Sequence, residues 1–259
     1  MKIITKYFNA ETQWKNYDSG SFRFGTLRGY ASGEDGDGER FSDDSEGTIT
    51  THYGKAGDEI KHLEIGGLSI GNLRSIPPAP EGTPLYELWK EMAVPIAYNQ
   101  KFDANIFCAS LGPYSVAHHR IMRYGSNELK VPYKGNEELT GWAEINVAKF
   151  VRATRAWVMK NSAYPEIRNG SAPFLLERPV SYNKRVERRP INDAHAAGDF
   201  SEDTINRLVF QKPERFQPER EFRITVSSHP LQHTSKTVPM FPKSFALKRS
   251  IIRMGRVKP

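Results

Sequence analysis

The residues best suited to chemistry are Glu219, Glu221 and Arg223, which alternate with other residues near the end of the chain. In a strand, residues two apart point to the same face, so the two carboxylates would lie about 7 Å apart with the guanidinium next in line. Like charges that close raise the pKa of at least one carboxyl group unless a cation or water offsets them. In a cleft the pair would serve catalysis, and on a solvated face it would form an ordinary Glu–Arg ion pair. The sequence leaves both alternatives open.

A strand from Glu219 to Val226 is predicted to position these side chains. Its other face carries one charged residue and then apolar ones, namely Arg220, Phe222, Ile224 and Val226. This is the period-2 pattern of a half-buried strand. Pro213 and Pro218 precede it, and proline cannot donate to a sheet ladder, so the approach is predicted to be a turn or a sheet edge.

The rest of the chain has the pattern of short strands with a few helices. Strands are predicted at 3–8, 21–31, 102–110, 142–150 and 250–257, and helices at 10–17, 85–92, 115–124 and in the second half of 193–208. This mixture predicts an α+β fold. We expect residues 1–259 to form a single domain with an acidic loop at 33–47, a proline-rich connector at 77–84 and a basic C-terminal strand region at 223–259.

The composition excludes several classes of protein. Among 259 residues there is one cysteine, Cys108, which excludes an intramolecular disulfide framework and a cysteine-rich zinc site. No apolar run is long enough to cross a membrane, and the first residues lack the pattern of a signal peptide. We therefore expect a cytoplasmic protein that does not bind a membrane.

The acidic loop at 33–47 has some features of a calcium loop but lacks others. Counted from Asp35, the loop has Arg40 where an EF-hand needs glycine and Ser42 where it needs an apolar residue. The adjacent His118 and His119 would point to different faces of a helix and cannot share one metal. We therefore expect no bound metal.

Positive charge gathers at the C-terminal end. The net charge is +7, and no acidic residue follows Glu221. Eight cations do follow it: Arg223, Lys236, Lys243, Lys248, Arg249, Arg253, Arg256 and Lys258. Such a region suits phosphate in a nucleotide or in RNA or DNA, and the alternative is a solvated face that aids solubility.

Common enzyme signatures are absent from the chain. It has no phosphate loop of the P-loop type, no Gly-x-Gly-x-x-Gly, no His-Glu-x-x-His and no Gly-x-Ser-x-Gly. These absences argue against a P-loop ATPase, a Rossmann enzyme, a zinc protease and an α/β-hydrolase.

Four segments, taken together, resemble a known group of proteins. They are Lys6-Tyr7-Phe8, Ser21–Leu27 with Tyr30, Phe107–Ser110, and Lys212 through Arg223. In this order they resemble a widespread bacterial and phage family of unknown function, and they also resemble a compact ADP-ribosyltransferase fold. The chain departs from the arginine class of that fold in lacking a Ser-Thr-Ser strand motif, and it lacks the early histidine of the diphtheria-like class.

The resemblance implies a compact split β-sheet core with short helices that holds NAD as co-substrate. It implies a macromolecular acceptor, a role as a toxin or in phage–host conflict, and a cognate inhibitor protein. It assigns catalysis to Glu221 with Glu219 beside it. It assigns NAD binding to Tyr7, Arg23, Thr26, Tyr30 and Ser110.

The chemistry of NAD cleavage is compatible with these residue types. Breaking the nicotinamide–ribose bond passes through an oxocarbenium-like state, which a carboxylate such as Glu221 would stabilise. Glu219 would then orient the acceptor, Arg23 would bind a phosphate through two hydrogen bonds, and Tyr30 would stack on nicotinamide. Two alternatives stay open: a nuclease in which Glu219, Glu221 and an acidic-loop aspartate hold Mg²⁺, and a non-catalytic nucleic-acid-binding or interaction protein.

Overall fold

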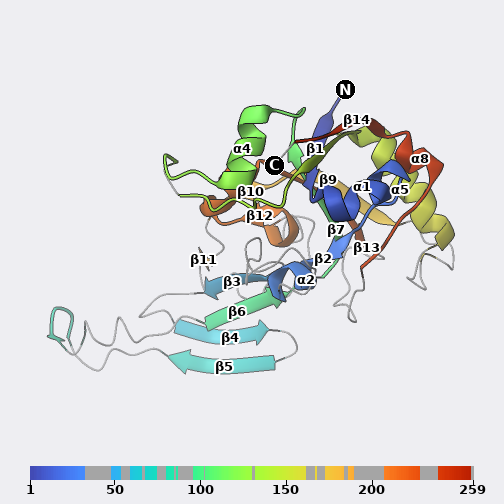
Figure 1. Ribbon diagram of the computed structural model, residues 1–259. Helices are drawn as coiled ribbons and strands as arrows, with labels where there is room; N and C mark the ends of the chain where they lie inside the picture. Colours follow the sequence, from blue (N-terminus) through green and yellow to red (C-terminus); the bar gives the residue numbers. More distant parts are fainter. Residues whose placement is uncertain are drawn as a thin grey trace.

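A computed structural model gives the fold (Figure 1). It describes residues 1–32, 48–53, 59–65, 68–74, 80–84, 86, 96–101, 103–129, 132–161, 167, 173–183, 186–189, 207–227 and 239–257. The predicted acidic loop at 33–47 lies outside these residues, as do the first part of the connector and nearly all of the predicted helices at 85–92 and 193–208.

A seven-stranded sheet lies at the centre of the described structure. Its order is β14-β8-β1-β7-β13-β9, and β2 also pairs with β7. Every pairing in it is antiparallel. The strands are β1 (Ile3–Phe8), β2 (Gly25–Thr26), β7 (Asn105–Leu111), β8 (Gly141–Asn146), β9 (Phe174–Pro179), β13 (Glu221–Ser227) and β14 (Ile251–Arg256). Helices packed on an antiparallel sheet confirm the predicted α+β class.

Helices and short segments cover the two faces of this sheet. Figure 1 shows α1 (Ala10–Asp18), α5 (Val147–Asn161) and α8 (Phe245–Lys248) on one side, away from α4 (Val116–Tyr124). The core beneath the first group is rich in aromatic rings, with Phe107 and Phe150 centred 4.8 Å apart and Phe22 edge-on to Phe150 at the same distance. Two further helical segments among the described residues are α2 (Leu27–Ser32) and the 3₁₀ helix η2 (Glu214–Glu219).

Three smaller sheets complete the described strands. In one, β3 (Thr48–Tyr53) lies between β6 (Ile96–Lys101) and β11 (Val186–Arg189); in another, β4 (Glu59–Ile65) pairs with β5 (Leu68–Arg74). The third joins β10 (Ser181–Tyr182) to β12 (Gln211–Lys212) in parallel. This last pairing places Lys212 opposite Tyr182.

Several predicted elements are confirmed, and two end or change earlier than predicted. The strands at 3–8 and 250–257 and the helices at 10–17 and 115–124 form close to their predicted bounds. Of the predicted strand at 21–31, only Gly25–Thr26 forms a strand, with isolated bridges at Ser21 and Phe24. The prediction is wrong after Thr26, whose Oγ1 accepts the Gly29 N–H at 2.8 Å and starts α2. The predicted strand at 142–150 stops at Asn146, whose Oδ1 accepts the Lys149 N–H at 3.0 Å and starts α5.

The predicted strand from Glu219 to Val226 begins two residues late. β13 starts at Glu221, and Glu219 is the last residue of η2. Between them Arg220 has left-handed backbone angles, φ 48° and ψ 43°. The chain therefore turns at Arg220 before joining the sheet.

The two central strands β1 and β7 pair over only a short length. Their register joins Ile4 to Leu111 and Thr5 to Ser110 and then stops. Beyond this point β1 continues beside β8, while the first residues of β7 pair with β2. The sheet is therefore open between β1 and β7 from Lys6 onward.

Candidate functional site

Glu221 and Arg223 lie on the inner strand β13, where neighbouring strands hold both in place. In the register with β7, Glu221 lies opposite Ser110 and Arg223 opposite Cys108. The Glu221 backbone N–H donates to the Tyr182 hydroxyl at 2.7 Å. Both side chains are buried, with Glu221 5% and Arg223 1% exposed. This excludes the alternative of an ion pair on a solvated face.

The turn at Arg220 brings Glu219 to the same place. The Arg220 N–H donates to the Gln217 carbonyl at 3.1 Å, and its own carbonyl accepts the Leu111 N–H at 2.7 Å. These bonds tie the turn to the end of β7. As a result Glu219 is also buried, 6% exposed, beside Glu221.

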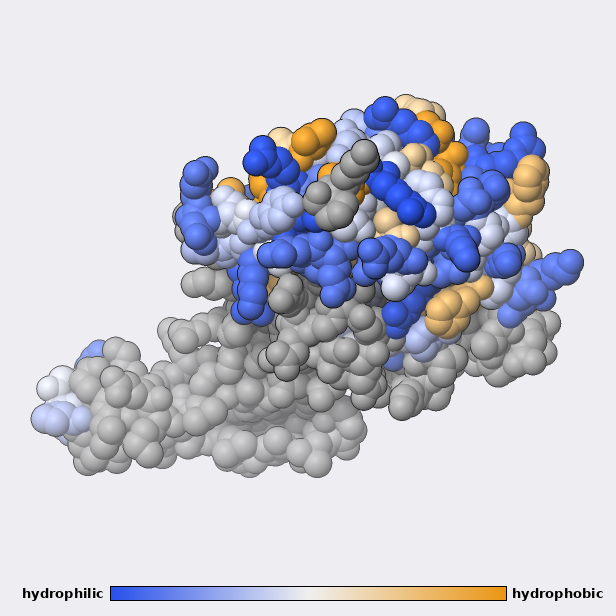
Figure 2. Space-filling view, in the orientation of Figure 1, coloured by the Kyte–Doolittle hydropathy of each residue, from blue (hydrophilic) through white to orange (hydrophobic). Residues whose placement is uncertain are grey.

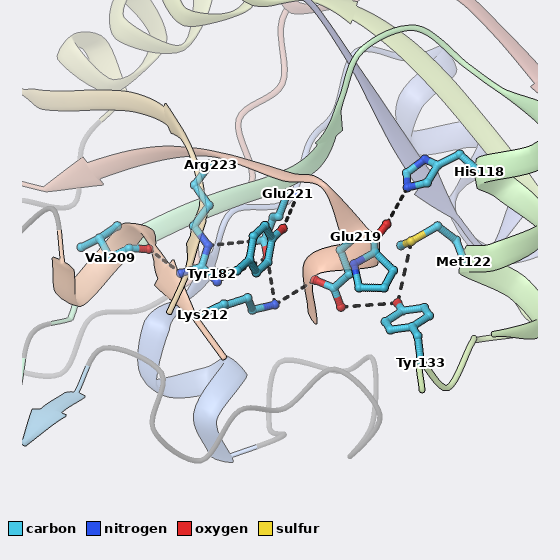
Figure 3. A network of polar contacts seen from close by, with 10 residues as sticks. His118, Met122, Tyr133, Tyr182, Val209, Lys212, Glu219, Glu221 and Arg223 are labelled. Atoms are coloured by element: carbon cyan, nitrogen blue, oxygen red, sulfur yellow. Dashed lines mark hydrogen bonds and ion pairs between the residues drawn. The ribbon is translucent and has the colours of Figure 1, made fainter. Parts of the chain in front are cut away.

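Lys212 joins the two carboxylates. Its Nζ lies 3.0 Å from Glu219 Oε2 and 2.8 Å from Glu221 Oε2 (Figure 3). On the far side of Glu221, Arg223 Nε donates to Oε1 at 2.7 Å and its Nη1 donates to the Val209 carbonyl. The buried network therefore runs from Arg223 through Glu221 and Lys212 to Glu219.

Tyr133 extends the network toward α4. Its hydroxyl lies 3.4 Å from Glu219 Oε1 and 3.7 Å from the Met122 sulfur. Burial raises the pKa of the Tyr133 phenol, and the Glu219 charge raises it further. Tyr133 is therefore a neutral hydrogen-bond donor to Glu219.

The two carboxyl groups have opposite pKa shifts. Burial raises the pKa of Glu219 to about 7, although Lys212 opposes the rise. Burial acts in the same sense on Glu221, but Arg223 and Lys212 outweigh it and hold the pKa of that carboxyl well below its ordinary value. Glu221 is therefore an anion at neutral pH, while Glu219 gains and loses a proton there. Two carboxyl groups with separated pKa values are an arrangement typical of acid–base sites.

This network forms one wall of a partly open cavity of about 90 Å³. It lies where β1 and β7 separate, and its lining includes residues of both strands. One water needs about 10–15 Å³ of such volume, so the cavity has room for roughly six to nine water-sized groups. The lining residues are Lys6, Tyr7, Tyr30, Cys108, Ala109, Ser110, Met122, Leu139, Lys212, Glu219, Glu221 and Arg223.

Three of the five residues assigned to NAD binding line this cavity: Tyr7, Tyr30 and Ser110. Arg23 does not line it and is exposed, because Phe22 and Phe24 on either side are buried in the core. Thr26 is buried and starts α2 rather than facing the cavity.

Tyr7 is held by His118. The Tyr7 hydroxyl lies 3.1 Å from His118 Nδ1, and His118 Nε2 lies 2.9 Å from the Pro218 carbonyl. A carbonyl only accepts, so Nε2 carries the proton and Nδ1 accepts from Tyr7. Burial lowers the pKa of His118 and favours this neutral form. One imidazole thus links the cavity wall on β1 to the helix that carries Glu219.

Sequence reasoning missed Lys212, Tyr133 and His118 as members of the site. Lys212 lies within the motif that ends at Arg223, but a lysine beside proline gives no local sign of a carboxylate partner. Tyr133 contacts Glu219, which lies 86 residues later in the sequence. His118 contacts Pro218, which lies 100 residues later. Only an expected need for buried cations beside two buried carboxylates would have pointed to Lys212.

Among the residues that the structure describes, no group of three or more His, Cys, Asp or Glu side chains could hold a metal ion. The Lys212 ammonium lies between Glu219 and Glu221, where a cation bridging them would bind. The acidic-loop aspartates of the nuclease alternative lie outside the described residues.

Of the eight cations after Glu221, Lys236 and Lys258 lie outside the described residues, and the other six differ in exposure and in their contacts. Arg223 is buried, and Arg253 donates to both oxygens of Glu144 at 2.7 Å. Arg249 and Arg256 are exposed and lie over the aromatic rings of Phe245 and Trp14. In the face of the molecule that Figure 2 shows, hydrophilic residues dominate the coloured part, with hydrophobic ones scattered among them.

Comparison of the chain with family models, with curated proteins and with solved structures found no match. Among the described helices, none is long and apolar enough to cross a membrane.

Proposed function

We propose that this protein is an ADP-ribosyltransferase-like enzyme, which cleaves the nicotinamide–ribose bond of NAD and transfers ADP-ribose to a macromolecule. The observation that carries the proposal is the pair Glu219 and Glu221, which face one cavity with opposite pKa shifts. The cavity that both carboxylates line lies at the opening between β1 and β7, where a co-substrate could enter. The exposed cations Arg249 and Arg256 favour nucleic acid as the acceptor.

Glu221 supplies the negative charge in this reaction. When the bond between C1′ of the ribose and nicotinamide breaks, nicotinamide leaves with the electron pair and positive charge develops on the ribose. The Glu221 carboxylate stabilises that charge. Lys212 and Arg223 keep it ionised despite burial and orient it, while offsetting part of its charge.

Glu219 acts as the general base that accepts the proton of the acceptor. An acceptor oxygen or nitrogen forms the new bond to C1′ and loses its proton, which the ionised Glu219 takes up. A base with a pKa near the operating pH is the most effective one, and the pKa of Glu219 is about 7. Tyr133, which donates toward Glu219 Oε1, holds the carboxylate in position.

The aromatic lining suits the nicotinamide end of the co-substrate. Tyr7 and Tyr30 both line the cavity, and tyrosine rings stack on flat heteroaromatic groups. A cavity of about 90 Å³ holds one end of NAD and not the entire dinucleotide. The remainder of the co-substrate must extend through the open side.

Nicotinamide release from NAD tests the proposal, measured with total RNA, DNA or protein as acceptor. Glu221→Gln should lose on the order of 10²–10³ in rate, the scale for one electrostatic stabiliser, while NAD binding changes little. Glu144→Gln is the matched control, because Glu144 is also buried and paired with an arginine but lies outside the cavity lining. It should keep the wild-type rate per folded molecule.

The proposal fails if the wild-type protein neither binds NAD nor releases nicotinamide with any acceptor. It also fails if Glu221→Gln, shown by thermal melting to be folded, releases nicotinamide at the wild-type rate. Equal loss of NAD binding and rate in that variant would contradict the transition-state role of Glu221.

A further inference from the structure

The cavity carries more positive than negative charge. Three cationic side chains and two carboxylates line it: Lys6, Lys212, Arg223, Glu219 and Glu221. With both carboxylates ionised, one positive charge remains in excess. Protonation of Glu219 increases that excess.

Lys6 is the source of this excess. Lys212 and Arg223 lie within 3.0 Å of a carboxylate oxygen. Lys6 has no ion pair with any residue in the part of the chain that the structure describes, and its ammonium instead lies 5.6 Å from the centre of the Phe107 ring. A cation–π contact at that distance is weaker than a charge-assisted hydrogen bond to an anion. A bound anion would therefore displace it.

Lys6 borders the opening of the sheet and lines the cavity. Lys6 is half-buried and follows Thr5, the last residue of β1 to pair with β7. Its charge acts on the Cys108 thiol across the opening, where it opposes the rise in pKa that burial causes. Lys6 is thus the cation on the β1 side of the cavity, across from the network on β13.

We propose that Lys6 binds an anionic group of the ligand, so that this site selects phosphate-bearing ligands. This assignment rests on the proposed function only for the identity of the ligand. If the ligand is NAD, the anionic group is its diphosphate. The uncharged parts of the ligand then lie against Tyr7 and Tyr30, and the ribose lies between Lys6 and Glu221.

Binding of ADP-ribose and of inorganic pyrophosphate tests this assignment, measured by calorimetry on the full chain. Lys6→Met should weaken both by about 10- to 100-fold, the range for one hydrogen bond to a charged group. Lys6→Arg should restore most of the affinity. Binding of free nicotinamide, which has no phosphate, should not change in either variant.

Lys2→Met is the matched control. Lys2 precedes the same strand, and its ammonium lies 4.2 Å from the centre of the Phe222 ring, but it does not line the cavity. It should leave affinity for both anions unchanged. Equal affinities of wild type and Lys6→Met, or an equal loss in Lys2→Met, would overturn the proposal.

The two proposals fail in different ways. If nicotinamide release is unchanged in Lys6→Met while anion binding is also unchanged, the Lys6 assignment is wrong and the enzymatic proposal stands. If anion binding depends on Lys6 but no acceptor supports nicotinamide release, the anion site stands and the transferase proposal is wrong.

Discussion

The free energy of unfolding of Glu219→Gln should increase relative to that of wild type as the pH rises from 4.5 to 8. Glu219 is buried, and burial raises the pKa of its carboxyl group to about 7. The folded protein therefore holds this proton more tightly than the unfolded chain does. Between the two pKa values the unfolded state binds fewer protons, so the free energy of unfolding falls as the pH rises. Glutamine has the same shape and no such cost.

The size of the effect follows from the shift. The pKa rises from an ordinary 4.5 to about 7, and each unit corresponds to about 1.4 kcal/mol. The stability of wild type minus that of Glu219→Gln should therefore fall by about 3 kcal/mol over the range, with most of the change complete by pH 7. Since Glu221 shares Lys212 with Glu219, the transition belongs to the pair and would be broader than that of one site.

Urea unfolding at intervals of pH, followed by tryptophan fluorescence, measures this difference. Glu144→Gln is the control of opposite sign. Hydrogen bonds from Arg253 lower the pKa of Glu144, so its contribution is present above the unfolded pKa and is lost as the pH falls. The difference between wild type and this control should stay flat from pH 6 to pH 8. A flat or rising difference for Glu219→Gln would refute the buried, proton-binding state of Glu219.

Three further predictions concern activity, the turn before β13 and nucleic acid. The rate of nicotinamide release should rise with pH through about 7 as Glu219 loses its proton, and a profile unchanged in Glu219→Gln would contradict its role as base. Arg220→Gly should change the free energy of unfolding by less than about 1 kcal/mol because glycine accepts φ 48°. Arg220→Val should lower it by more, on the order of 1–3 kcal/mol. Equal urea midpoints for the two variants would contradict this. Replacing Arg249 and Arg256 by alanine should weaken RNA binding. The slope of the log of the binding constant against the log of the salt concentration should become shallower by about one unit for each phosphate that is no longer neutralised. A slope equal to that of wild type would show that these residues serve solubility alone.

The grouping of Glu219, Glu221 and Arg223 could be predicted from the sequence, but not the geometry that produces it. Alternation places all three on one strand face. The structure brings them together with Glu219 outside the strand, because Arg220 adopts a left-handed conformation. Arginine gives no sign of that conformation, which asparagine or glycine would have suggested. A period-2 pattern therefore identifies the right residues while misplacing the start of the strand.

The NAD-binding residues show where local patterns stop being informative. Tyr7 lies on a strand predicted within its true bounds, and it lines the cavity. Arg23 is predicted as a phosphate ligand, although alternation already places it on the face opposite Phe22 and Phe24. Those two rings are buried, since this segment runs beside the residues around Met240 and Pro242. The burial of neighbours, not the chemistry of its own side chain, decides where Arg23 points.

The energetics of the Lys212 network favour a functional reason for it. Buried ion pairs often stabilise a fold less than apolar residues of the same volume would. Here one ammonium serves two buried carboxylates, and it does not prevent the pKa of Glu219 from rising to about 7. The fold thus keeps a group that destabilises it at neutral pH, beside a cavity that it could have filled with apolar side chains. Perturbed carboxyl groups of this kind concentrate at sites where chemistry or binding uses them, and a structural ion pair such as Glu144–Arg253 shows no comparable cost.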